Sequence, residues 1–200
     1  AMHNAVYPLS PELDAIPRVE HPKEKVVTFL GRITMQKGPE YFVEAAALVL
    51  KRTKNIRFVF AGSGDMYEAM VNLAAERGIA DKFHFPGFQR GKQVYEAYKN
   101  SDVFVMPSRY EGLGIVLIEA QANGLPCVIS EDVITAEADA GAGLVTRVSL
   151  AESPKKWAEA CLNTVGRKPS DEVRTAIVNS GYDINTVAHW LQNFYIKNWK

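Results

Sequence analysis

Two glutamates in the stretch SRYEGLGIVLIEA have types and spacing that could do chemistry. Glu111 precedes two glycines, and Glu119 comes eight residues later, after an apolar run at residues 115–118. Carboxylates accept hydrogen bonds from hydroxyl groups, so a sugar or a ribose would give both a partner. Two other interpretations stay open. One is an acid–base pair, which only the distance between the carboxyl groups can diagnose. The other is a solvated turn followed by a half-exposed Glu119.

A second stretch, GRITMQKGP, places two cations just after an apolar run. Arg32 and Lys37 lie in a short loop, and Gly38 with Pro39 suits a helix start, because proline is favoured at the first helical position. A helix N-terminus has unpaired amides and a positive potential, which favour an anion. We therefore expect a phosphate or diphosphate here, although the GxxxxGK[ST] pattern of a P-loop is absent. The alternative is an ordinary turn with two solvated cations.

Three other stretches carry weaker signals. Gly62 and Gly64 could approach a ligand, but we expect a plain turn in which Asp65 caps the next helix. Phe88 could line a base or sugar pocket, and core packing is the favoured interpretation of its aromatic surroundings. His84 alternates within an apolar run, which predicts a structural role.

Short apolar runs that alternate with helical patterns must position these residues. The alternation predicts βαβ units and a Rossmann-like α/β fold of three layers, a mainly parallel six-stranded sheet with helices on both faces. Ligands of such sheets bind beyond the carboxyl ends of the strands, where the loops described above would meet. Strands are expected at residues 26–30, 56–61, 83–85, 103–106, 127–129 and 143–145, and helices at 39–51, 66–77, 94–99, 115–123, 154–165, 170–179 and 184–198.

The composition bounds the class of protein. The chain has 200 residues, 47% of them apolar, and a formal net charge of zero. A substantial core is therefore expected, and binding of nucleic acid through net charge is not. No apolar stretch reaches the ~18 residues of a transmembrane helix. The two cysteines, Cys127 and Cys161, lie in apolar runs, which predicts buried, reduced thiols and a cytoplasmic protein.

The same pass along the chain divides it into three parts. Residues 1–24 contain four prolines and predict a lead-in, residues 25–182 form the Rossmann-like domain, and residues 183–200 form a C-terminal helix. Asp183 is the expected N-cap of that helix. Trp190, Leu191, Phe194 and Asn198 share one of its faces, and packing on the domain's own core is favoured over contact with an absent domain.

GRITMQKG, followed some eighty residues later by EGLGIVLIEAQANGLPCVIS, resembles the retaining glycosyltransferases of family four, over residues 4–145 at least. Those enzymes have the two-domain GT-B fold, so the resemblance implies one half of that fold. It implies sugar transfer from a nucleotide-diphosphate sugar to an acceptor such as a growing glycan or a lipid-linked saccharide, with retained anomeric configuration. No cofactor and no metal are expected, which agrees with the absence of an Asp-x-Asp-type pair near these motifs.

The resemblance also implies roles for individual residues. Arg32 and Lys37 would hold the donor diphosphate and serve catalysis, Glu119 would bind the ribose, and Glu111 would position the transferred sugar rather than attack it. The other residues implied are Gly112, Leu113, Gly114, Ile115 and Val116 for the donor, Phe88 for the nucleobase, and Glu137 in a later loop.

The sequence departs from the family's pattern in two places. Many members have Pro-Phe-Gly after the first glutamate, whereas this chain has Leu113 between two glycines. The loop SEDVITAEA lacks the paired glycines that are common there. Donor preference and the diphosphate contact from that loop therefore do not follow from the resemblance.

The family's N-terminal domain, which supplies most of the acceptor site, has no counterpart in this sequence. We therefore expect an excised donor-binding domain that binds nucleotide and is inactive by itself. The missing N-terminal domain is its expected partner, and the full enzyme could contact a membrane peripherally. Two other functions stay open: a GT-B-type sugar-nucleotide epimerase, and a non-catalytic binding or scaffolding domain.

Overall fold

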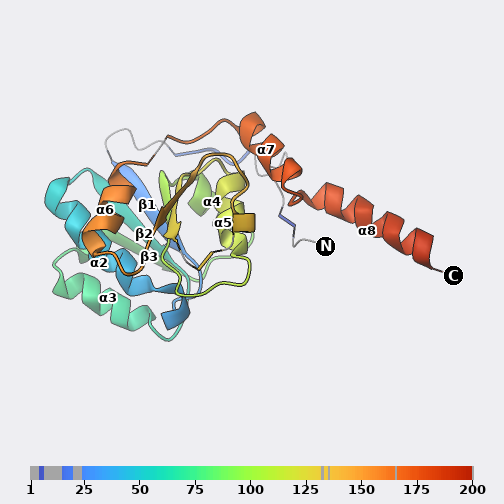
Figure 1. Cartoon of the computed structure of the whole chain (residues 1–200). Coiled ribbons are helices and arrows are strands. Elements are labelled where there is room, and N and C mark those ends of the chain that lie inside the picture. Colours follow the sequence, from blue (N-terminus) through green and yellow to red (C-terminus); the bar gives the residue numbers. More distant parts are fainter. Residues whose placement is uncertain are drawn as a thin grey trace.

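The centre of the molecule is one parallel sheet (Figure 1). The computed structural model describes residues 5–6, 15–19, 24–131, 133–134, 136–164 and 166–199. Every neighbouring pair of strands runs parallel, which confirms the predicted fold class. The strand order is β3-β2-β1-β4-β5-β6, so the direction of winding reverses between β1 and β4. The strands are β1 (Lys25–Leu30), β2 (Ile56–Ala61), β3 (Phe83–Gly87), β4 (Val103–Met106), β5 (Cys127–Ser130) and β6 (Val145–Val148).

Helices cover both faces of this sheet. Those of one face, α2, α3 and α6, pack side by side, and α4 and α5 lie on the other face (Figure 1). Their bounds are α2 (Pro39–Arg52), α3 (Tyr67–Glu76), α4 (Lys92–Lys99), α5 (Ile115–Ala122), α6 (Pro154–Leu162), α7 (Ser170–Asn179) and α8 (Ile184–Asn198), with short 3-10 helices η1 (Met35–Lys37), η2 (Ala80–Lys82) and η3 (Ala136–Ala138).

Aromatic and aliphatic side chains fill both layers between helices and sheet. On the α2 side, the rings of Phe29 and Phe60 stack with centroids 4.9 Å apart, and Trp157 of α6 is fully buried. On the other side, the buried Tyr98 and Phe104 meet edge to face. Each such side chain contributes about 1.5–3 kcal/mol by burial. The result is a rigid base for the loops at the carboxyl edge of the sheet.

A few predicted details differ from the structure. The sixth strand begins at Val145 rather than at residue 143, because Gly143 adopts φ 66° and ends the turn before it. Helix α6 ends at Leu162, and residue 165, where the prediction placed its end, lies outside the described residues. Asp65 does not cap α3: the cap position is Met66, with no side-chain hydrogen bond. That prediction was wrong.

Only parts of the predicted lead-in are described. Val6 forms a parallel bridge with Asp183, so this part of the lead-in pairs with the backbone just before α8. Arg18 pairs with Asp102 at 2.6 Å. The other residues of 1–24, apart from 5, 15–17, 19 and 24, lie outside the described residues.

Helix α8 points away from the domain (Figure 1). Asp183 is its N-cap, as predicted, and accepts a hydrogen bond from the Thr186 amide at 2.8 Å. No residue of α8 is buried: Trp190 and Phe194 are each 49% exposed, and Trp199, which follows the helix, is 82% exposed. Packing of this face on the domain's own core was the wrong expectation. Among the described residues, no helix has the length and apolar character needed to cross a membrane.

Candidate functional site

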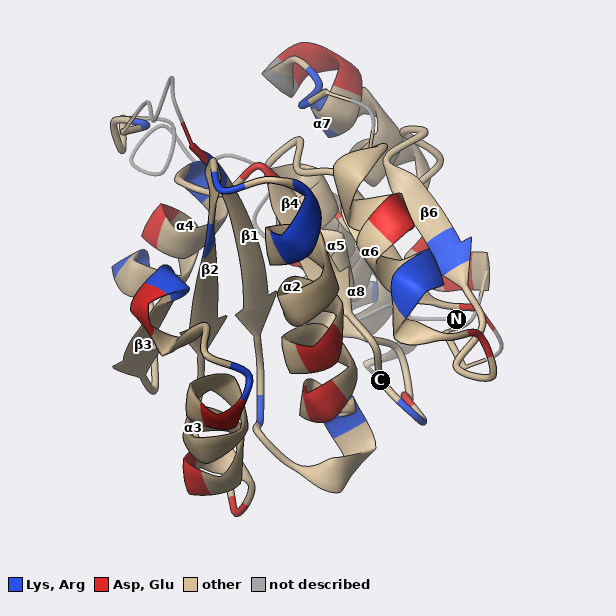
Figure 2. Cartoon of the chain, turned by 90° about the vertical axis from the view of Figure 1, so that its left-hand side faces the viewer, with Lys and Arg blue, Asp and Glu red and all other residues tan. Residues whose placement is uncertain are grey.

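A cleft of about 280 Å³ lies at the carboxyl edge of β1, β2 and β3. The loop between β1 and α2 supplies its cations, and Figure 2 shows Lys and Arg in blue along this loop. Four residues that the sequence predicted for the site line the cleft: Arg32, Lys37, Phe88 and Val116. The other lining residues are Leu30, Gly31, Ala61, Gly62 and Gln89.

The loop after β1 is shaped by close backbone contacts. Gly38 adopts φ 60°, ends η1 and precedes Pro39, the first residue of α2. A Cβ atom on Gly38 would lie 2.2 Å from the Pro107 carbonyl oxygen, which belongs to the loop after β4. Only glycine therefore allows these two loops to approach so closely. The approach brings Lys37 next to the loop that carries Glu111.

Gly62 and Gly64 also allow a close backbone contact with the loop after β1. A Cβ atom on Gly62 would lie 1.8 Å from the Gly31 carbonyl oxygen, and one on Gly64 would lie 2.1 Å from that of Ile33. These glycines let the loop after β2 lie against the loop after β1. Their spacing is explained by this backbone contact without a ligand.

Lys37 and Glu111 form a nearly buried ion pair. The Lys37 Nζ atom lies 2.5 Å from Glu111 Oε1, and their side chains are 13% and 6% exposed. The Ser108 hydroxyl donates to the same Glu111 oxygen at 2.6 Å. Ser108 is itself fixed, because its carbonyl accepts from the Ser130 hydroxyl at 2.7 Å. The Glu111 carboxylate is therefore held at one oxygen by two donors.

Glu119 lies on α5, one turn after Val116, and is not among the residues that line the cleft. Its Oε2 atom accepts a hydrogen bond from the Tyr98 hydroxyl at 3.1 Å, and this hydroxyl lies 3.2 Å from the Val116 carbonyl. Burial raises the pKa of Glu119 above its ordinary value, and the hydrogen bond from Tyr98 opposes that shift. The pKa of Tyr98 is raised well above its ordinary value by burial and by Glu119, so the phenol stays a donor.

The N-terminus of α5 completes the edge. Gly114 is the N-cap with φ 73°, and the amides of Ile115 and Val116 lie in the first turn, where no preceding turn supplies carbonyl partners. Gly112 is exposed in the loop before it, and Leu113 packs toward a small cluster that includes Ile118. Among the described residues, no group of three His, Cys, Asp or Glu side chains is placed to hold a metal ion.

Phe88 is 66% exposed, so the expectation that it packs in the core was wrong. It follows β3 and borders the cleft, with Gln89 beside it. His84 of β3 is exposed and lines a second hollow.

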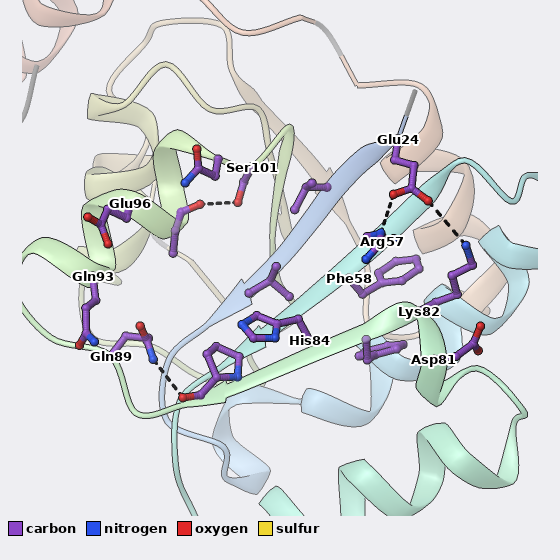
Figure 3. A pocket seen from close by; sticks show the side chains of 16 residues that line it. Glu24, Arg57, Phe58, Asp81, Lys82, His84, Gln89, Gln93, Glu96 and Ser101 are labelled. Atoms are coloured by element: carbon purple, nitrogen blue, oxygen red, sulfur yellow. Dashed lines mark hydrogen bonds and ion pairs between the residues drawn. The ribbon is translucent and has the colours of Figure 1, made fainter. Parts of the chain in front are cut away.

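That second hollow has about 530 Å³ and lies over β1 to β3, next to α4 (Figure 3). It contains none of the cations or carboxylates that the sequence assigned to a ligand. Its own cations are already paired: Arg57 Nε lies 2.5 Å, and Lys82 Nζ 3.7 Å, from Glu24. We therefore place the candidate site in the smaller cleft.

The family model for glycosyl transferases group 1 matches residues 14–160, which contain the whole cleft. The chain belongs to this family. The matched range begins within the lead-in and ends in α6.

A curated relative in this family is about twice as long as this chain. "Putative glycosyltransferase EpsF" of Bacillus subtilis (strain 168) is 36% identical over 172 residues, which are 85% of this chain and 44% of EpsF. The chain thus spans less than half the length of that relative.

Solved structures with the same fold are GT-B glycosyltransferases. The apo form of the lipopolysaccharide outer core galactosyltransferase WaaB matches with a TM-score of 0.73 at 20% identity, over 98% of this chain and 55% of WaaB. A mutant of S. aureus TarM, in complex with fondaparinux, alpha-GlcNAc-glycerol and UDP, matches with a TM-score of 0.74 at 19% identity, over 96% of this chain and 38% of TarM. One half of a GT-B fold is thereby confirmed.

Several residues around the candidate site were not predicted from the sequence. Ser108 stands three residues before Glu111, and this short spacing was a signal that could have been used. Tyr98 reaches Glu119 from α4, and no local pattern connects the two. Gln36 and Arg109 join the loops after β1 and β4, as described below.

Proposed function

We propose that this chain is the donor-binding domain of a retaining glycosyltransferase that uses a nucleotide-diphosphate sugar. The observation that carries the proposal is Lys37: it lines the cleft beside Arg32 and is paired there with Glu111. UDP in the TarM complex supports a nucleoside diphosphate as the ligand class.

The diphosphate is proposed to bind between two kinds of positive charge. Arg32 is exposed and carries one hydrogen bond, to Gln36 Oε1 at 2.9 Å, so its guanidinium can turn toward phosphate oxygens at little cost. The amides of Ile115 and Val116 add the positive end of α5. In a cleft walled by Leu30 and other apolar groups these donors act at short range, where they stabilise negative charge more strongly than in water.

The two glutamates are proposed to bind hydroxyl groups at the two ends of the donor. Both contacts to Glu111 use Oε1, so Oε2 is the atom we assign to a hydroxyl of the transferred sugar. Glu119 would accept from the ribose, with Tyr98 holding its carboxylate. Gly112, Leu113 and Gly114 would supply backbone near the sugar, and Phe88 would stack on the base; an exposed aromatic ring suits that role.

The proposed reaction breaks the bond between the anomeric carbon and the β-phosphate oxygen. The acceptor hydroxyl oxygen forms the new bond on the same face of the sugar, and its proton goes to the departing diphosphate. Negative charge grows on that diphosphate, which is where Arg32 and Lys37 would stabilise it. Glu111 is held by two donors and would position the sugar rather than act as nucleophile. The cationic side chains make a metal unnecessary in this scheme.

The acceptor is proposed to bind to an N-terminal GT-B domain, which is the partner we propose for this chain. The exposed rings of Trp190 and Phe194 on α8, which stack with centroids 5.5 Å apart, give such a domain an apolar surface to contact. We propose that the chain alone binds donor without transferring sugar, and that the full enzyme works in the cytoplasm, at times beside a membrane. The free, buried thiols of Cys127 and Cys161 fit a reducing compartment.

A thermal-shift panel of nucleotide sugars tests the proposal. We expect UDP- or GDP-linked sugars to raise the melting temperature, since a ligand that binds only the folded state stabilises it. Free sugars without a nucleotide serve as the control. No shift with any nucleotide sugar at millimolar concentration would contradict donor binding. Turnover of UDP-N-acetylglucosamine without an acceptor would favour an epimerase instead.

A further inference from the structure

Arg109 connects the loop after β4 to the loop after β1 at several points. Its Nη1 group donates to the Met35 carbonyl at 2.8 Å, and its Nη2 group pairs with Glu40 Oε1. Its guanidinium carbon lies 5.2 Å from the centre of the Tyr41 ring, within cation–π range. Its backbone amide donates to the Gln36 carbonyl at 2.7 Å. All four partners lie within seven residues of the chain, immediately around Lys37.

Gln36 extends the same connection toward the other cation. Its side-chain amide donates to the Tyr110 carbonyl at 3.0 Å, and its Oε1 atom accepts from Arg32 at 2.9 Å. The loop bearing Arg32 and Lys37 is therefore fixed to residues 109–110 by side-chain and backbone bonds, next to the ion pair with Glu111.

The Arg109 contacts require a guanidinium. One planar group reaches a carbonyl, a carboxylate and an aromatic face at once, which a lysine ammonium cannot do. The partner depends on it as well: Glu40 Oε2 is buried with no partner among the described residues, so Arg109 is the cation that compensates this carboxylate. The side chains of Arg109 and Glu40 are 30% and 29% exposed, so both are mostly shielded from water.

From this geometry we propose that Arg109 is a positioning residue for the donor diphosphate. It fixes the loop carrying Arg32 and Lys37 against the loop carrying Glu111, so that both cations face the cleft before the donor arrives. The inference rests on the proposed function for the identity of the ligand. Preorganised cations bind an anion more tightly because less ordering is needed on binding.

The test compares four variants around Arg109 and one control variant with the wild type, by calorimetry with UDP and with inorganic diphosphate. Arg109→Gln, Arg109→Lys and Glu40→Gln should each weaken both ligands about threefold to tenfold, because a loosened loop must be ordered again when the ligand binds. The double variant Arg109→Gln/Glu40→Gln should bind no more weakly than whichever single variant binds more weakly, because both substitutions break the same ion pair. Arg52→Gln, which breaks an exposed pair at the far end of α2, should bind like the wild type.

Two results would overturn the inference. One is wild-type affinity in Arg109→Gln. The other is full affinity in Arg109→Lys together with tighter binding in Glu40→Gln, which would mean that Arg109 touches the phosphate directly. Hydrogen exchange without ligand gives an independent readout: the amides of residues 35–38 should exchange faster in Arg109→Gln than in Arg52→Gln. If the wild type binds neither ligand, the proposed function fails, whereas unchanged exchange contradicts the role of Arg109 itself.

Discussion

The Lys37 Nζ atom lies 2.5 Å from Glu111 Oε1, although the two residues are 74 positions apart in the chain. The two loops that carry them leave neighbouring strands, β1 and β4, at the point where the winding of the sheet reverses. Such a point is where open parallel sheets bind ligands. The ion pair therefore joins the two loops and forms part of the candidate site.

Removing one partner of this pair should cost much stability. Lys37→Met leaves the Glu111 carboxylate, 6% exposed, without its cation, and we expect a loss of about 3 kcal/mol in the free energy of unfolding. Glu111→Gln should cost less, because an amide oxygen can still accept from Ser108. Urea unfolding measures both. The matched control is Arg52→Gln, whose pair with Glu159 spans 3.6 Å and is exposed, with an expected change below about 1 kcal/mol. Equal losses of unfolding free energy in Lys37→Met and Arg52→Gln would contradict a buried ion pair at Lys37.

Gly38 should tolerate no side chain. Gly38→Ala combines the strain of φ 60° with a Cβ atom 2.2 Å from the Pro107 carbonyl, and we expect a loss of about 3 kcal/mol. Gly78→Ala is the control, because Gly78 has φ 68° but no atom within 4 Å of the added Cβ. That change should cost only the backbone strain, about 1 kcal/mol. Chemical denaturation of the two variants separates steric contact from strain, and equal losses would show that the loops do not meet at Gly38.

The raised pKa of Glu119 predicts a pH dependence with a definite sign. The folded state favours the protonated carboxyl, so this contribution to stability is present below the ordinary pKa of 4.5 and is lost as the pH rises through the folded-state pKa. Glu119→Gln stays neutral throughout. Its stability relative to the wild type should therefore increase as the pH rises from about 4 toward neutral. Urea midpoints at several pH values measure this difference, and two parallel curves would be inconsistent with the raised pKa.

Glu119 should also distinguish a nucleotide from a bare diphosphate. With Glu119→Ala we expect about tenfold weaker binding of UDP, the cost of one hydrogen bond to a charged acceptor, and nearly unchanged binding of inorganic diphosphate. Calorimetry with both ligands compares them. An equal loss of affinity for UDP and for inorganic diphosphate would contradict ribose binding by Glu119.

Much of the fold could be predicted because its signals are local. Short apolar runs, Pro39 at a helix start and Asp183 at an N-cap each report on nearby backbone, and all three predictions are confirmed. The start of β6 was missed because Gly143 adopts a positive φ, and the cap of α3 was missed because the Met66 amide donates to the Ile33 carbonyl in another loop.

The site could be predicted only in part, for the same reason. The sequence showed that Arg32, Lys37 and Glu111 follow strands, and the parallel sheet then brings their loops to one edge. It could not show that Glu111 pairs with Lys37, or that Tyr98 holds Glu119, because these contacts depend on how separate crossovers pack. Phe88 was misjudged because its aromatic neighbours belong to β3, whereas Phe88 lies in the loop after that strand and is exposed at the cleft.

Calorimetric titration with UDP and GDP tests the central claim, diphosphate binding by the cations of the cleft, most directly. The wild type should bind at least one of them, and Arg32→Ala with Lys37→Ala should weaken that binding about a hundredfold, roughly 1.4 kcal/mol for each charge-assisted contact. Arg32→Ala alone, at an exposed side chain, should weaken binding without loss of stability. If the wild type binds neither nucleotide at millimolar concentration, or if the double variant binds like the wild type, the donor assignment is contradicted.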